Sequence, residues 1–118
     1  MSRSLVIKLL VGADQLERLQ TGLSVAAAAC AADVDVSLWL AGDAAWLGVA
    51  PALSRLVIDD HTAELLAAVL PAATVAVCAR CAQRRGISSG DLRLGVTIQG
   101  AAAFVAAITK PGVQALVY

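Results

Sequence analysis

Short apolar runs alternate with segments rich in alanine and leucine along the whole chain. The runs at 5–11 and 34–40 have the length and composition of buried strands, and each ends close to a glycine. Between them, residues 15–32 favour a long helix, and Asp14 is the expected N-cap. The first third of the chain therefore predicts a strand, a helix and a second strand.

The rest of the chain continues this alternation. Asp60 is the expected cap of a helix that Pro71 ends. The other predicted elements are a helical turn at 44–47, helices at 61–70, 79–85 and 101–109, and strands at 75–77, 96–98 and 113–118. Strands and helices at this spacing predict an α/β fold with three layers, in which a mostly parallel five-stranded sheet has helices on both faces.

Several residues suited to a site follow the predicted strands directly. Gly12, Gly42, Asp43 and Cys78 each stand just beyond a strand. Because ligands bind beyond the carboxyl ends of parallel strands, these residues are expected to share one rim of the sheet.

Cys78 stands where a buried strand gives way to a short basic helix that Gly86 ends. The free N–H groups and the positive end of a helix N-terminus stabilise a thiolate, and three arginines within seven residues add positive potential. Both effects lower the pKa of a cysteine below its free value of about 8.5. The alternative is a cysteine packed in the core, which would be inert.

The composition narrows the possible partners. The 118 residues fit one domain, 1–118; 59% of them are hydrophobic and only 15% are charged, with a formal net charge of zero. So little polar surface predicts subunit interfaces. Nucleic-acid binding is not expected, because the chain lacks a clustered basic face and has few aromatic residues.

The apolar runs are too short for a membrane span. The run at 23–32 stops at Asp33, and the run at 65–79 is interrupted by Pro71, whereas a spanning helix needs about 20 residues. The N-terminal residues do not have the pattern of a signal peptide. Three cysteines, an odd number, then favour reduced thiols in the cytoplasm.

The segment around Cys78 resembles the DsrE/DsrF-like family of sulfur-relay proteins, in particular its TusD-like and YchN-like members. The matching pattern is a V-x-V strand ending in Cys78, then a short Ala-rich helix finishing in R-R-G-I at 84–87. The sequence L-W-L-A-G-D at 38–43 and the closing strand at 113–118 are also consistent with the family. One departure is Cys81, where TusD-like members carry a small apolar residue.

The resemblance implies an intracellular sulfur carrier, similar to a sulfurtransferase. Cys78 would accept sulfane sulfur as a persulfide and pass it to a thiol of a partner, with Arg85 and the helix N-terminus as electrostatic support. Arg85 lies seven residues after Cys78, two helical turns along the same face. The implied partners are sulfur donor and acceptor proteins and further copies of the chain, as in a trimer or a hexamer.

Two other functions fit the same residues. The chain could be a structural or regulatory subunit that never carries sulfur, or Cys78 and Cys81 could form a C-x-x-C redox pair in which Cys81 resolves a persulfide or closes a disulfide. A zinc site needs about four ligands, and besides these thiols the chain offers only His61 and the remote Cys30. No cofactor is expected, because the glycines form no nucleotide-binding motif.

Overall fold

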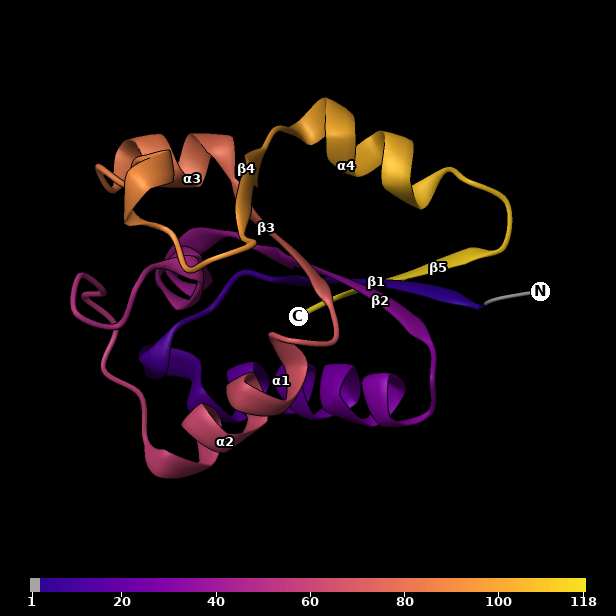
Figure 1. Cartoon of the computed structure of the whole chain (residues 1–118), viewed down its shortest axis with the longest axis horizontal. Coiled ribbons are helices and arrows are strands. Elements are labelled where there is room, and N and C mark those ends of the chain that lie inside the picture. Colours follow the sequence, from indigo (N-terminus) through magenta and orange to yellow (C-terminus); the bar gives the residue numbers. More distant parts are fainter. Residues whose placement is uncertain (1–2) are drawn as a thin grey trace.

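A parallel sheet of five strands forms the centre of the computed structural model, which describes residues 3–118 (Figure 1). The strands lie in the order β4-β3-β2-β1-β5, and every neighbouring pair is parallel. The predicted α/β class and the five strands are confirmed. The strands are β1 (Ser4–Leu9), β2 (Asp35–Leu40), β3 (Thr74–Cys78), β4 (Thr97–Gln99) and β5 (Val113–Val117).

Helices cover both faces of the sheet. Figure 1 shows α1 and α2 on one side of it and α4 on the other, which confirms the three predicted layers. The helix α3 follows β3 directly. The α-helices are α1 (Leu16–Ala31), α2 (Asp60–Val69), α3 (Ala79–Arg84) and α4 (Ala101–Ile108), and the 3₁₀ helices are η1 (Ala13–Gln15), η2 (Gly42–Gly48) and η3 (Ser89–Asp91).

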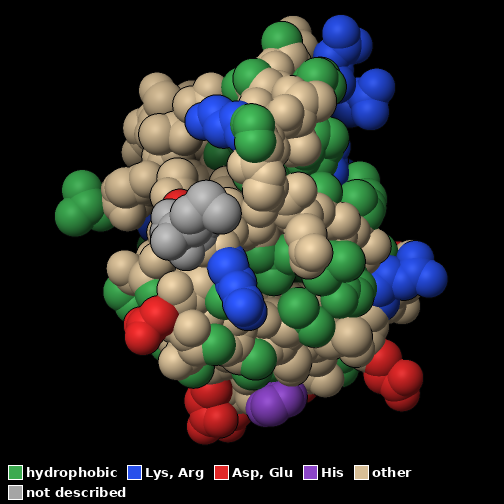
Figure 2. Space-filling view, turned by 90° about the vertical axis from the view of Figure 1, so that its right-hand side faces the viewer, with side chains coloured by type: hydrophobic (Ala, Val, Ile, Leu, Met, Phe, Trp, Pro, Cys, Tyr) green, Lys and Arg blue, Asp and Glu red, His purple; other side chains and the backbone are tan. Residues whose placement is uncertain are grey.

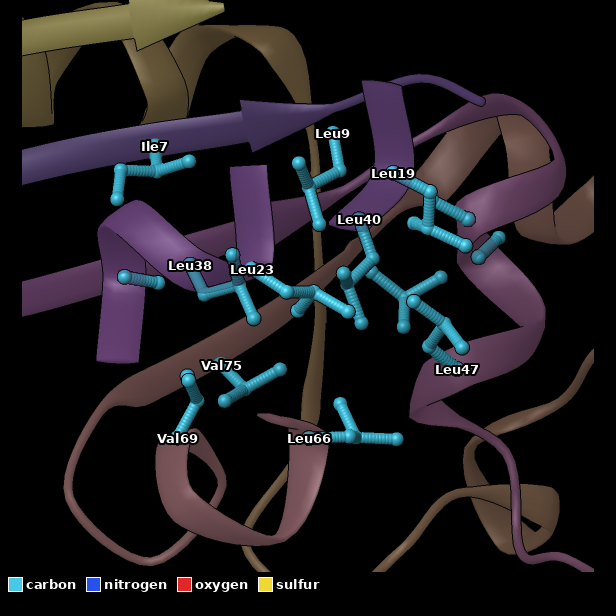
Figure 3. Close-up of a cluster of buried hydrophobic side chains, with 14 of the residues drawn as sticks. Ile7, Leu9, Leu19, Leu23, Leu38, Leu40, Leu47, Leu66, Val69 and Val75 are labelled. Atoms are coloured by element: carbon cyan, nitrogen blue, oxygen red, sulfur yellow. The ribbon is translucent and has the colours of Figure 1, made fainter. Parts of the chain in front are cut away.

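The main core lies between the sheet and the helices α1 and α2. Leucine, isoleucine and valine side chains from β1, β2 and β3 meet leucines of the two helices there (Figure 3). Successive residues of a strand point to opposite faces, so Ile7 and Leu9 belong to this core while Val6 belongs to a smaller cluster on the other face. That cluster contains Trp39 and Ala76 and packs against α4. Lys8, which alternates with Ile7 and Leu9, is thereby placed on the α4 face.

Two predicted helix caps were wrong. Asp14 lies inside the 3₁₀ turn η1, and α1 starts after Gln15 without a side-chain cap. Asp60 is the first residue of α2, and the cap is Asp59, whose carboxylate accepts a hydrogen bond from the N–H of Thr62 at 2.8 Å. An N-cap carboxylate must reach the free N–H groups of the first turn, and Asp59 has the extended backbone that allows this.

No helix within residues 3–118 combines the length and the hydropathy that a membrane span requires.

Candidate functional site

Cys78 is the last residue of β3 and the N-cap of α3. Its side chain is half-buried and lines a cavity of about 40 Å³ at the carboxyl ends of the strands. Residues of β1, β2, β4 and α4 complete the wall, together with one residue after β2 and one before α4. They are Lys8, Trp39, Leu40, Ala41, Gln99, Gly100, Ala101 and Phe104.

An aromatic pair and a lysine form one wall of this cavity. The rings of Trp39 and Phe104 pack edge to face, with their centroids 5.2 Å apart. Lys8 is the register partner of Trp39 in the neighbouring strand, and its Nζ atom lies 4.4 Å from the centroid of the Phe104 ring. This contact has the geometry of a cation–π interaction, which fixes the ammonium group beside the cavity.

The surroundings of Cys78 favour its thiolate. Burial raises the pKa of the thiol, but the N–H of Cys81, the Cys81 side chain, the N–H of Arg80 and the charge of Lys8 lower it, so that the pKa lies below its ordinary value. The Cys78 side chain accepts no capping hydrogen bond from the N–H groups of α3. The two N–H groups therefore act on the sulfur as nearby dipoles that favour negative charge.

Cys81 lies one helical turn after Cys78 and also faces the loop that follows β2. Its Sγ atom accepts a hydrogen bond from the N–H of Gly42 at 3.2 Å. This bond attaches the start of η2 to α3. The structure thus brings the second thiol close to the first and gives it a structural contact of its own.

Arg85 pairs with a carboxylate at the same end of the sheet. Its guanidinium forms an ion pair of 2.9 Å with Asp43 and donates a second hydrogen bond to the carbonyl oxygen of Cys81. Asp43 and Cys81 therefore fix its position, and the cation that lowers the pKa of Cys78 is Lys8. The ion pair and the Cys81–Gly42 bond confirm that the residues after β2 and β3 share one rim.

Sequence reasoning missed the lysine and the aromatic pair. Lys8 interrupts the apolar run of β1, and a charged residue inside a buried strand is unusual enough to mark a site. Phe104 is the one phenylalanine in the chain, but nothing in the sequence places it beside Lys8. The strand order and the packing of α4 bring these residues together.

The other candidate ligands lie elsewhere. Cys30 packs against the main core, and burial raises the pKa of its thiol. His61 is in the first turn of α2. Among residues 3–118, no three histidine, cysteine or acidic side chains are grouped closely enough to hold a metal ion.

The opposite pKa shifts of Cys78 and Cys30 predict a difference in reactivity. The thiolate is the reactive form, so at pH 7 we expect iodoacetamide to modify Cys78 more than about tenfold faster than Cys30. As the pH rises, the rate at Cys78 should level off before the rate at Cys30 does. Peptide mapping of samples taken over time measures both rates in one protein, and equal rates would contradict the assignment of Cys78 as an activated thiol.

Comparisons with known proteins support the resemblance. No curated protein sequence matches the chain. The crystal structure of the ychN protein from E. coli superposes with a TM-score of 0.79 over the whole of both chains, at 21% sequence identity, and therefore shares the fold. The model of the DsrE/DsrF-like family matches residues 5–117. The chain belongs to the DsrE/DsrF-like family.

Proposed function

We propose that this protein is an intracellular sulfur carrier that accepts sulfane sulfur as a persulfide on Cys78 and passes it to a thiol of a partner protein. Membership of the family supports a role in sulfur relay. The observation that carries the finer proposal is the placement of Cys78, a thiol with a lowered pKa that lines a cavity at the end of the sheet.

The chemistry requires no oxidant. The Cys78 thiolate attacks the outer sulfur of a donor persulfide, a new S–S bond forms on Cys78, and the donor thiolate leaves with the electron pair of the broken bond. Transfer to the acceptor repeats the same exchange with Cys78 as the leaving thiolate. A low pKa helps in both steps, because a thiol with a low pKa is present as the attacking thiolate and also leaves more readily.

Mass spectrometry tests the proposal directly. After incubation with a donor that carries sulfane sulfur, the wild-type protein should gain the mass of one sulfur atom, on the peptide that contains Cys78. Dithiothreitol should remove this mass, because a persulfide is cleaved by thiols. A wild-type protein that gains no sulfur under these conditions would contradict the carrier function.

A non-catalytic role in an assembly is the second candidate, and the surface of α4 favours it. All eight residues of α4 are apolar and none is buried. Val105 is 53% exposed, and Val117 of the adjacent strand β5 is 59% exposed. Figure 2 shows several hydrophobic patches on the face at the right of Figure 1, among isolated charged side chains. We propose that copies of the chain associate through α4 and the edge strand β5, as a homo-oligomer.

Val105→Glu tests this association. A glutamate in the apolar interface would bury an unpaired charge, so we expect the variant to sediment as a monomer at micromolar concentration while the wild type sediments as a larger species. Leu94→Glu is the matched control, because Leu94 is fully exposed beside β4, at the opposite edge of the sheet. A monomeric wild type would contradict the proposed interface.

A redox pair is the third candidate, because the Cys81 side chain is among the groups that act on Cys78. Peptide mapping after mild oxidation distinguishes the redox pair from the other two candidate functions. A reversible disulfide between Cys78 and Cys81 would support a thiol switch, and its absence would leave Cys81 with its structural contact to Gly42.

A further inference from the structure

Lys8 is the single charged residue of β1, a strand that lies inside the sheet between β2 and β5. Its neighbours in register are Trp39 and Val117, which are both apolar. A cation at such a position loses part of its hydration, so an anionic partner would stabilise it. The fold places this charge at the carboxyl end of the sheet, beside Cys78.

No carboxylate in the part of the chain that the structure describes supplies that partner. The ion pair between Arg85 and Asp43 is the one found among residues 3–118, and Lys8 has none. The cavity wall contains no acidic residue, and β4 and α4 carry no charge. Of the other charged groups on the elements around Cys78, Asp35 lies at the opposite end of β2, and Arg80 and Arg84 in α3 do not line the cavity. Among the described residues, Lys8 is thus the one charged side chain that lines the cavity.

The cavity has room for added sulfur beside this lysine. A volume of about 40 Å³ exceeds the roughly 30 Å³ that one water molecule occupies, so the cavity can hold one added atom. The aromatic ring of Phe104 keeps the ammonium group at the wall rather than in bulk water. A sulfur atom bound to Cys78 would therefore enter a space that already contains a fixed positive charge.

We propose that Lys8 is the positioning residue for the anionic sulfur of Cys78, holding the thiolate before transfer and the outer sulfur of the persulfide afterwards. The part that concerns the persulfide rests on the proposed carrier function, whereas the part that concerns the thiolate does not. The exchange described above leaves the negative charge on the departing donor thiolate. The outer sulfur of the new persulfide becomes an anion when it releases its proton to solvent, and Lys8 balances the charge that this creates.

Removal of the lysine charge tests the role at the thiolate. In Lys8→Met, the rate of Cys78 alkylation at pH 7 should fall about three- to tenfold, and its pH profile should move to higher pH. Iodoacetamide is the reagent of choice because it is neutral, so that attraction of the reagent by the lysine does not contribute. Lys8→Arg keeps the charge and should restore most of the rate.

Lys110→Met is the matched control. Lys110 is the only other lysine of the chain and lies near Ser4 and Asp35, where the strands β1 and β2 begin, so its removal should leave the Cys78 profile unchanged. The reciprocal variant Cys78→Ser should make Lys8 react faster with an amine reagent, because the cation loses its partner. This second measurement decides the question if Lys8→Met does not fold.

The outcomes separate this proposal from the carrier function. A folded Lys8→Met protein with the wild-type pH profile, or a Cys78→Ser protein with unchanged labelling of Lys8, overturns the role of Lys8 even when Cys78 carries sulfur. A shifted profile in a protein that takes up no sulfur supports the thiolate part and rejects the carrier function. Where sulfur is taken up, the persulfide of Lys8→Met should pass to an acceptor thiol at a rate at least threefold different from that of the wild type, and an equal rate overturns the persulfide part.

Discussion

Cys78→Ser is expected to take up no sulfur from a sulfane-sulfur donor, whereas the wild type takes up one atom. Serine is nearly isosteric with cysteine, so the end of β3 and the start of α3 should keep their geometry. Its hydroxyl group is not ionised near neutral pH and forms no S–S bond. The expected effect is a complete loss of the adduct, which mass spectrometry of the intact protein detects.

The other two cysteines supply matched controls for this variant. Cys30→Ser should take up sulfur as the wild type does, because Cys30 packs against the core away from the cavity. Cys81→Ser should also form the adduct, and a longer lifetime of its persulfide would show that Cys81 resolves the wild-type one. Full uptake by Cys78→Ser would mean that another thiol carries the sulfur and would contradict the assignment.

The placement of Cys78 between a strand and a helix could be predicted from the sequence because its signals are local. An apolar β-branched run, a following segment free of glycine and proline, and Gly86 together define a strand, a helix and its end around Cys78. The structure has these elements at Thr74–Cys78 and Ala79–Arg84, and Gly86 has the positive φ of 66° that a glycine after a helix adopts.

The rest of the cavity could not be predicted, because it depends on contacts between distant segments. Lys8 and Trp39 become neighbours only once β1 and β2 pair in register, and Phe104 joins them when α4 packs on that face. Arg85 shows the same limit. Its spacing from Cys78 indicates a shared helix face, but Asp43 after β2 supplies an ion-pair partner that helical periodicity does not reveal.

The sequence also could not decide which of two adjacent aspartates caps α2. Asp59 and Asp60 are equally good N-caps by residue type. The position at which the chain turns into α2 decides between them, and that position depends on packing. Gln20 of α1 donates hydrogen bonds to both Asp59 and Thr62, so the contact between α1 and α2 helps to fix the first turn.

Gly42 links the fold to the site, because only glycine fits where β2 turns toward η2. Its φ of 51° lies in the left-handed region, and a Cβ atom there would overlap with the carbonyl oxygen of Leu10. The same residue donates its N–H to the sulfur of Cys81. Gly86 also has a positive φ, but nothing lies within 4 Å of the position of its Cβ. Replacing each glycine by alanine therefore distinguishes the free-energy cost of the left-handed backbone conformation from the cost of the steric overlap.

Gly42→Ala is expected to lower the free energy of unfolding more than Gly86→Ala. The left-handed conformation costs alanine about 1–2 kcal/mol at either position, and the collision with Leu10 adds about 1–3 kcal/mol at Gly42. Urea denaturation of the two variants measures the difference, and equal losses would contradict the steric argument. Because relief of the collision displaces the Gly42 N–H, Cys81 should also be alkylated faster in Gly42→Ala than in Gly86→Ala, which would show that this turn holds the second thiol in place.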